Sequence, residues 1–300
     1  MALIDFILNL AGLLLWLNWR SVRLDPLGKR KPATLIGTLR RAGPRRWRRW
    51  HLLAALGGLL LLRAVFYWQI GPAAHWTGTL NLNVITLSFR SDFFARMLWF
   101  SIFSFGLTLG VFYLWLLLLS ILSGPEPPSF HRLVRMQLGR IDRWPPGVKL
   151  LLPLAITAAF WLAASWLLTW LQIIPPPVSA ARRIEAALII GLNSYLVWKY
   201  VIGALLTLHL LNSYIYFGKN PFWAYVNAEA QTLLSPLRRV PLRLDKVNFA
   251  PVVGIVLIFL FAHFAENGIK SSDRVSETGK RLPPLIEIPG LVDIYGKLPF

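Results

Sequence analysis

The amino-acid sequence predicts an all-α fold, that of a polytopic integral membrane protein with six transmembrane helices. Of its 300 residues, 56% are hydrophobic and 15% are charged, whereas about a quarter of the residues in a soluble domain are charged. The apolar residues fall in runs of about 20, the length of helix that crosses a bilayer. The runs are continuous rather than alternating, so they predict helices and not the strands of a barrel.

Six apolar runs define the predicted spans, and together they make a membrane domain over residues 1–264. The spans cover residues 2–19, 51–70, 93–122, 150–174, 184–211 and 249–264. We expect Pro175-Pro176-Pro177 to stop the fourth span, because proline cannot continue a helix. Residues 265–300 are rich in Pro and Gly, with equal numbers of acids and bases, and should form an extracytoplasmic tail.

The segments between the spans alternate between basic and charge-poor. Residues 20–50 contain eleven basic residues against a single acid, Asp25, and residues 123–149 and 212–248 are also basic. Positively charged loops stay in the cytoplasm. We therefore expect all three basic segments inside and both termini outside, in a multi-pass membrane protein. The net charge of +19 then favours anionic lipid headgroups over nucleic acid as the partner.

The charge-poor segment 71–92 has alternating apolar residues, which predict a small β-hairpin. They are Leu80, Leu82 and Val84, then Ile85, Leu87 and Phe89.

Two basic segments contain helix-spaced apolar stripes, as expected of amphipathic helices in the headgroup layer. In the second segment the stripe is Phe130, Leu133, Val134, Leu138 and Ile141, opposite Arg132, Arg135 and Arg143. In the third it is Phe222, Val226, Ala230, Leu233 and Leu237. Pro236 would end or kink that helix. The alternative is that these cations only set the topology.

An internal repeat suggests that the protein is built from hairpins. Residues 34–41 read TLIGTLRR and residues 232–239 read TLLSPLRR. Each stretch lies in a basic segment and is followed after about ten residues by a span. A shared position between two spans of the same orientation favours duplication.

The third basic segment resembles the YggT family of small bacterial and plastid membrane proteins. The resemblance rests on residues 216–222 (YFGKNPF), 236–239 (PLRR) and 248–251 (NFAP), within a match over residues 212–264 and a degraded copy at 13–70. Asn248 and Ala250 stand where the family usually has Asp and Ser. The resemblance implies an integral, multi-pass protein of the bacterial plasma (inner) membrane. It also implies a role in membrane organisation, division or osmotic stress, or in cytochrome maturation as for plastid relatives.

Charged residues inside the predicted spans are candidates for function, because they are costly to insert. Arg63 lies in the second span and Lys199 near the middle of the fifth, and we expect no carboxylate at matching depth. Arg63 and Arg96 can extend toward the outer surface. Lys199 could contact helix carbonyls, or bind an anion or a lipid phosphate.

The sequence offers no recognisable catalytic chemistry. There is no cysteine, which excludes disulfides and thiolate metal sites. No Gly-rich phosphate loop, Ser-His-Asp set or carboxylate pair occurs. The five histidines do not form a favoured pair for haem. We therefore expect a protein that is not an enzyme and holds no cofactor or metal.

The leading functional hypothesis is a non-enzymatic membrane scaffold or accessory subunit. Its Arg-rich cytoplasmic helices would bind anionic lipid, a partner protein or a second copy of the chain. The candidate residues are Arg40, Arg41, Arg45, Arg46, Arg132, Arg135, Arg238 and Arg239. The alternative is a transporter or channel for a small solute or ion, with a midplane site near Lys199. A third, weaker alternative is a factor for haem assembly.

Overall fold

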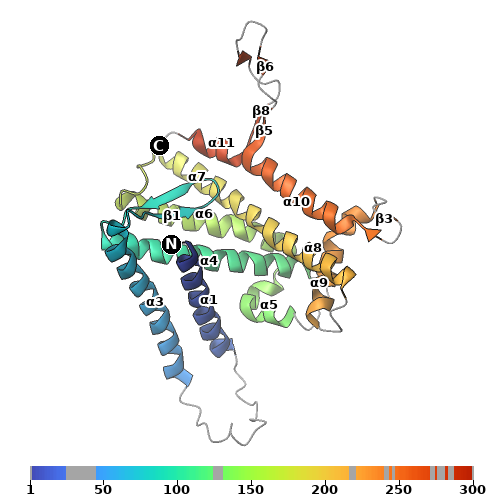
Figure 1. Ribbon diagram of the computed structural model, residues 1–300, viewed down its shortest axis with the longest axis horizontal. Helices are drawn as coiled ribbons and strands as arrows, with labels where there is room; N and C mark the ends of the chain where they lie inside the picture. Colours follow the sequence, from blue (N-terminus) through green and yellow to red (C-terminus); the bar gives the residue numbers. More distant parts are fainter. Residues whose placement is uncertain are drawn as a thin grey trace, which may run out of the picture. The chain divides into compact units, whose positions relative to one another are not determined.

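Helices dominate the computed structural model (Figure 1), in agreement with the predicted fold class. The structure describes residues 2–24, 45–123, 131–215, 221–239, 243–244, 247–270, 274–275, 281–282 and 287–298. Within these residues, six helical stretches are long and apolar enough to cross a membrane, as the sequence predicted. They are Leu3–Arg20, Trp50–Ala73, Phe94–Leu122, Pro146–Trp170, Ala180–Tyr214 and Ala250–Asn267.

The long helices extend slightly beyond most of the predicted spans. Their bounds are Ala2–Leu24 (α1), Arg45–Ala73 (α3), Phe94–Leu122 (α4), Pro146–Trp170 (α6), Ala180–Asn193 (α7), Trp198–Tyr214 (α8) and Ala250–Asn267 (α10). The short helices are His131–Leu138 (α5), Gly139–Arg143 (η1), Ser194–Val197 (η2), Pro221–Leu233 (α9), Ser235–Arg239 (η3) and Leu291–Gly296 (α11).

Within the described residues the strands form four two-stranded sheets. Gly78–Asn81 (β1) pairs with Thr86–Phe89 (β2), and Arg243–Leu244 (β3) with Val247–Asn248 (β4). Gly268–Lys270 (β5) pairs with Glu287–Pro289 (β8), and Arg274–Val275 (β6) with Arg281–Leu282 (β7).

The β1–β2 pair confirms the hairpin predicted between the second and third spans. Leu80, Leu87 and Phe89 are buried, as the alternating pattern required. The turn contains Asn83 in a left-handed conformation (φ 62°), and its backbone N–H donates to the side chain of Asn81 at 2.8 Å. Asn suits such a turn because its short polar side chain tolerates that conformation.

The chain separates into two compact units. The first unit contains Met1–Leu80 and Ser88–Phe112, and the second contains Asn81–Leu87 and Tyr113–Phe300. In the first unit α1 packs on α3. A Cβ at Gly12 of α1 would lie 2.9 Å from the ring of Phe105 on α4, so a larger residue there would require the ring to shift.

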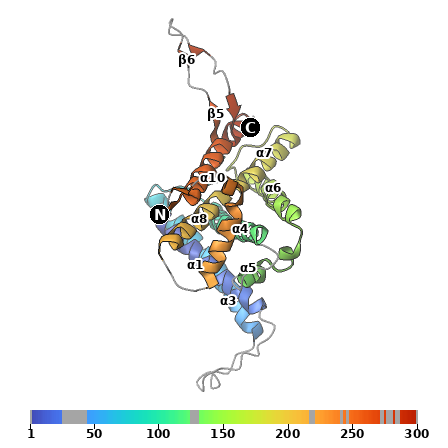
Figure 2. The same cartoon turned by 90° about the vertical axis from the view of Figure 1, so that its right-hand side faces the viewer.

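In the second unit the continuous helical stretch made of α7, η2 and α8 packs against two other helices, α6 and α10. Helix α7 packs on α6, and α8, which continues α7 through η2, packs on α10; both pairings are visible in Figures 1 and 2. Gly191 of α7 lies against Leu154 of α6, and Gly203 of α8 against Phe259 of α10. The stretch Ala180–Tyr214 has 35 residues and is about 52 Å long, so it exceeds a hydrocarbon core of about 30 Å.

The fifth predicted span, residues 184–211, lies within the helical stretch Ala180–Tyr214. The helix begins at Ala180, ends at Tyr214, and tightens to a 3₁₀ turn at Ser194–Val197. Two indole groups hold this turn: Trp115 of α4 donates to the carbonyl oxygen of Val197 at 3.3 Å, and Trp198 donates to that of Leu114 at 3.0 Å. These partners lie far apart in sequence, which explains why the local pattern gives no sign of the turn.

The predicted end of the fourth span at residue 174 was wrong, because α6 ends at Trp170 before the prolines. Gln172 has a left-handed conformation (φ 56°). The N–H of Ile173 donates to Leu168 O at 2.9 Å, and that of Gln172 to Thr169 O at 3.0 Å. This is the Schellman pattern that closes a helix C-terminus, and the prolines only follow it.

The third basic segment contains a helix, as predicted, and this helix ends shortly before Pro236. Helix α9 ends at Leu233, and Ser235–Arg239 continues as a 3₁₀ turn. Val226 and Ala230 of the predicted stripe are buried. Ala230 packs with Leu206 of α8 and Leu234 in a small hydrophobic core.

Candidate functional site

Arg63 is the centre of a buried polar cluster in the first unit. Its side chain is 0% exposed. Nη2 donates to Asp5 Oδ1 at 2.8 Å and to Ser104 Oγ at 2.8 Å, and Nη1 donates to Asn9 Oδ1 at 2.7 Å. Three helices, α1, α3 and α4, therefore meet at one guanidinium. We call Asp5, Asn9, Arg63, Tyr67 and Ser104 the Arg63 cluster.

Helical spacing places these side chains opposite one another. Asp5 and Asn9 are one turn apart on α1, and Arg63 and Tyr67 are one turn apart on α3. The Tyr67 hydroxyl donates to Asp5 Oδ1, and Asn9 Nδ2 donates to Ser104 Oγ at 3.0 Å. Among the described residues Arg63 Nε has no hydrogen-bond partner.

Aromatic rings enclose the guanidinium. The Cζ atom of Arg63 lies 5.4 Å from the ring centroid of Phe100 and 5.7 Å from that of Tyr67. Trp76 packs against both rings, at centroid distances of 5.6 Å and 4.5 Å. The negative ring faces attract a cation, so the surroundings stabilise the arginine charge together with Asp5.

The expectation that Arg63 extends outward and meets no carboxylate was wrong. Arg63 lies ten residues from the end of α3 at Ala73, a depth of about 15 Å along the helix. Pairing with Asp5 on a neighbouring helix satisfies the charge locally. The sequence pattern did not indicate Asp5 as the partner because it is a single acidic residue near the start of an apolar run. Its spacing of four from Asn9 is the signal that could have identified it.

Lys199, predicted to lack a carboxylate at its depth, also has one. Its Nζ atom lies 3.1 Å from Glu266 Oε2, and the two side chains are 12% and 22% exposed. The lysine also lies over the ring of Tyr200, 5.3 Å from the centroid. The prediction failed because α10 continues to Asn267, past the predicted span end at residue 264, and so includes Glu266.

A second buried polar cluster joins α4, η1 and α6 in the second unit. Lys149 Nζ donates to Ser120 Oγ at 2.8 Å and to Ser120 O at 3.3 Å. Ser120 Oγ donates to Asp142 Oδ1 at 2.6 Å, and Arg135 Nε donates to Asp142 Oδ2 at 2.9 Å. The Asp142 side chain is only 4% exposed, and the contacts with Ser120 and Arg135 compensate its buried charge. We call these four residues the Asp142 cluster.

Glu229 on α9 contacts the C-terminal end of α4. Ser123 Oγ donates to Glu229 Oε1 at 2.7 Å, and Glu229 is 2% exposed. Burial raises the pKa of the Glu229 carboxyl, and the hydrogen bond from Ser123 opposes this in part. Burial, and then the charge of Glu229, raise the pKa of Tyr225 one turn earlier. Within the described residues Glu229 Oε2 has no hydrogen-bond partner.

Comparison with protein-family models, curated proteins and solved structures gives no match. The resemblance to the YggT family therefore stays a prediction that rests on the motifs alone.

Most of the predicted lipid-binding or partner-binding arginines have no described side chain. Arg40 and Arg41 lie outside the described residues. Five more lie in helices or turns for which only the backbone is described: Arg45, Arg46, Arg132, Arg238 and Arg239. Arg135 is described, and its half-exposed side chain is already paired with Asp142. Its guanidinium is therefore only partly open to an external anion.

Among the described residues, no three His, Asp or Glu side chains gather closely enough to hold a metal ion. His209 Nδ1 instead lies 2.8 Å from Asn227 Oδ1, and His263 Nδ1 lies 3.0 Å from Asn267 Nδ2. The first contact joins α8 to α9, and the second lies within α10.

Proposed function

We propose that this protein is a non-enzymatic, multi-pass scaffold or accessory subunit of the bacterial plasma membrane. Its basic segments would lie at the cytoplasmic face and bind anionic lipid headgroups or a partner protein. One observation carries the proposal: Arg63 and Lys199, the two intramembrane cations that the sequence singled out, are each paired with a carboxylate from a different helix. Pairs of this kind hold helices together, and they leave no net charge to bind a transported ion.

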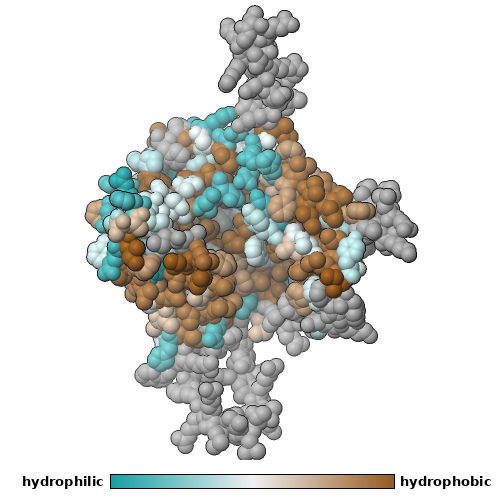
Figure 3. All heavy atoms as spheres, viewed as in Figure 1, coloured by the Kyte–Doolittle hydropathy of each residue, from teal (hydrophilic) through white to brown (hydrophobic). Residues whose placement is uncertain are grey.

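The surface of the helices supports residence in a membrane. Large apolar side chains are exposed along them, among them Leu14 (59%), Leu62 (66%), Trp166 (66%) and Phe261 (65%). Figure 3 shows apolar residues spread over the described helices on the face in view. A soluble protein rarely exposes so much contiguous apolar surface, whereas lipid chains would cover it. The long helix Ala180–Tyr214 would then cross obliquely or project beyond the hydrocarbon core.

The partner class follows from charge. The chain has 32 Lys and Arg residues against 13 Asp and Glu. The positive-inside pattern would bring most of the excess to one leaflet, where each cation near an anionic surface is worth about 1 kcal/mol. The paired cations Arg63 and Lys199 contribute nothing to this attraction, so the basic segments must supply it.

The experiment replaces Arg40, Arg41, Arg238 and Arg239 together by Gln. Native mass spectrometry in mild detergent would then count retained anionic lipid, and affinity capture would report protein partners. We expect both to fall. The matched control is Arg90→Gln, an exposed arginine in a segment predicted to lie outside. Unchanged lipid retention and unchanged capture in the quadruple variant would remove the proposal.

One observation favours the second candidate, a transporter or channel with a site near Lys199. Asn193 is buried directly before the 3₁₀ turn; its Nδ2 donates to Leu82 O in the hairpin turn at 2.6 Å. Its Oδ1 has no hydrogen-bond partner within the described chain. A 3₁₀ turn inside a helix often marks a hinge. Solute flux in reconstituted vesicles that is altered by Lys199→Met would favour this candidate over the scaffold.

A further inference from the structure

The turn between α5 and α6 carries four cations and one acid over residues 135–149, and the structure divides the cations into two pairs. Arg135 and Lys149 belong to the Asp142 cluster and are used internally. Arg140 and Arg143 are exposed, and among the described residues neither forms an ion pair. The second pair is therefore available for a ligand from outside the chain.

The Asp142 cluster fixes the turn that carries the exposed pair. Gly139 starts η1 with a φ of +64°, a conformation that glycine adopts without strain, and the chain changes direction there. Asp142, inside η1, is held by Ser120 of α4 and Arg135 of α5. Since a 3₁₀ helix has three residues per turn, side chains three apart share one edge. Arg140 and Arg143 therefore share one edge of a turn that the cluster holds in place.

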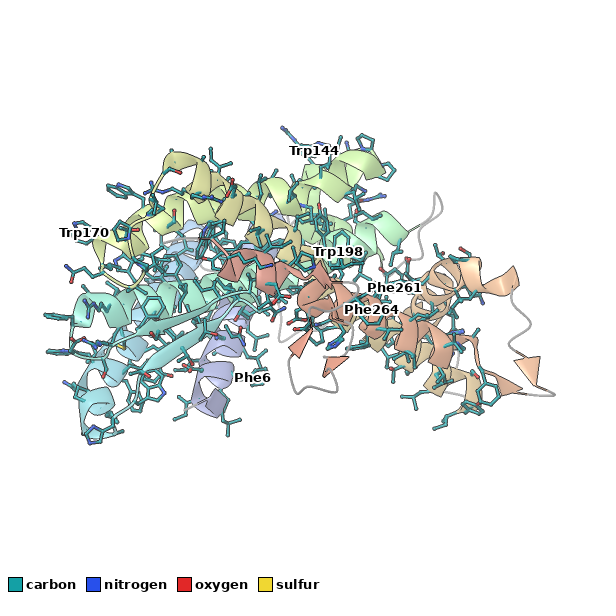
Figure 4. The ribbon with its side chains drawn as sticks, turned by 90° about the horizontal axis from the view of Figure 1, so that it is seen from above. Phe6, Trp144, Trp170, Trp198, Phe261 and Phe264 are labelled. Carbon is teal, nitrogen blue, oxygen red and sulfur yellow. The ribbon has the colours of Figure 1, made fainter. Side chains whose placement is uncertain are left out.

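An exposed aromatic and apolar surface continues from this edge onto the start of α6. Trp144 is 44% exposed and Val148 is 45% exposed, followed by Leu150 at 48% and Leu151 at 61%. Figure 4 shows Trp144 at the periphery beside the start of α6, directed away from the neighbouring helices. The order along the chain is thus two cations, one indole and then apolar residues. This order matches the layers of one membrane leaflet, from the phosphate groups through the interface to the acyl chains.

We propose that Arg140, Arg143 and Trp144 form a binding site for the headgroup of an anionic phospholipid. The planar guanidinium groups can each donate two hydrogen bonds to phosphate oxygens. The Trp144 indole lies where an amphipathic ring is favoured, and Val148, Leu150 and Leu151 contact the acyl chains. The inference rests on the proposed function in one respect: the turn must lie in the cytoplasmic headgroup layer.

The test compares Arg140→Gln/Arg143→Gln with Arg90→Gln as the matched control. Each protein is placed in nanodiscs of phosphatidylcholine that contain a minor share of phosphatidylglycerol, and the phosphatidylglycerol retained after extraction is counted by native mass spectrometry. We expect an affinity about five-fold lower for each arginine removed, which corresponds to about 1 kcal/mol per cation. Trp144→Ala should reduce retention of both lipids, and Arg90→Gln should change neither.

Two further arms separate the possible results. If excess inorganic phosphate at matched ionic strength displaces the lipid completely, the site recognises phosphate alone, and the assignment of the acyl-chain contacts to Val148, Leu150 and Leu151 is overturned. If Arg140→Gln/Arg143→Gln retains phosphatidylglycerol normally while the quadruple variant at 40, 41, 238 and 239 loses it, the inference fails and the proposed function stands. If both variants retain it, both fail. An unchanged melting temperature in detergent shows that any loss is not caused by unfolding.

Discussion

Asp5 on α1 and Arg63 on α3 form a 2.8 Å ion pair in which the arginine side chain is fully buried. Helix α1 buries very little else: within residues 3–20 only Gly12 is classed as buried. The attachment of α1 therefore depends on the Arg63 cluster and on the close approach of Gly12 to Phe105. Arg63, a candidate for function in the sequence, thus joins α3 to α1.

Asp5→Ala should destabilise the protein by about 3–5 kcal/mol, because it leaves the buried Arg63 without its counter-ion. The free energy of unfolding in mild detergent measures the loss. Asp5→Ala/Arg63→Met should recover much of it, since the unpaired charge is then gone.

Glu185→Gln is the control for that series. Glu185 pairs with Arg182 at 2.8 Å, but both side chains are nearly half exposed. Exposed pairs of this kind contribute at most about 1 kcal/mol. If Asp5→Ala costs no more than Glu185→Gln, the Arg63 cluster does not hold α1.

The attachment of α9 through Glu229 to Ser123, which follows α4, should weaken as the pH rises. Burial raises the pKa of the Glu229 carboxyl above its ordinary value of 4.5. A raised carboxyl pKa means that the folded state holds the proton more tightly than the unfolded state. The stabilisation is then fully present below pH 4.5 and is lost as the pH rises through the folded pKa. Hydrogen exchange of residues 221–233 at several pH values measures this.

Glu229→Gln should abolish that pH dependence, because glutamine keeps the shape and the acceptor for Ser123 but cannot ionise. Tyr225 on the same helix is affected by the charges of both Glu229 and Asp142 of η1. Asp142→Asn therefore serves as the control that removes the neighbouring charge. Exchange in Glu229→Gln that still accelerates with pH, after correction for intrinsic rates, would show that another group is responsible.

The number of long helices could be predicted from sequence because each depends on a local property. A continuous run of about 20 apolar residues is a sufficient signal by itself, as the run 93–122 and helix α4 illustrate. The hairpin at 78–89 and the end of α9 before Pro236 were also local, through period-two spacing and proline.

The candidate sites could not be predicted because they depend on distant partners. Arg63 and Asp5 are 58 residues apart, and Lys199 and Glu266 are 67 apart. Glu229 lies in a basic segment, where a carboxylate is usually solvated. Only the structure shows that it is buried and hydrogen-bonded to Ser123, which follows α4. The end of α6 depended on a left-handed Gln172, a conformation for which glutamine has no strong preference.

Exchanging the charges of Lys199 and Glu266 should preserve much of the stability that either single change removes. Lys199→Glu places two carboxylates together on α8 and α10, and Glu266→Lys places two cations together, so each single variant is destabilised by repulsion. The double variant restores an attractive pair. The melting temperatures of the four proteins form a double-mutant cycle. A double variant as unstable as the sum of the singles would show that the two side chains do not interact.

The contact of α7 with α6 should be sensitive to a single methyl group at Gly191. A Cβ there would lie 2.9 Å from Leu154 Cδ1 and 3.0 Å from Leu154 O. The methyl group of leucine can rotate away, but the carbonyl oxygen is fixed in α6. Gly191→Ala should therefore cost about 1–3 kcal/mol as the helices move apart.

Gly110→Ala in α4 is the matched control, because a Cβ at Gly110 meets nothing within 4 Å. Alanine is the better helix former by about 0.5–1 kcal/mol, so this variant should be neutral or slightly more stable. Unfolding in detergent, followed by circular dichroism, measures both variants. The opposite signs expected for one substitution separate packing from helix propensity. If Gly191→Ala stabilises as much as Gly110→Ala, then α6 and α7 do not approach as closely as the glycine implies.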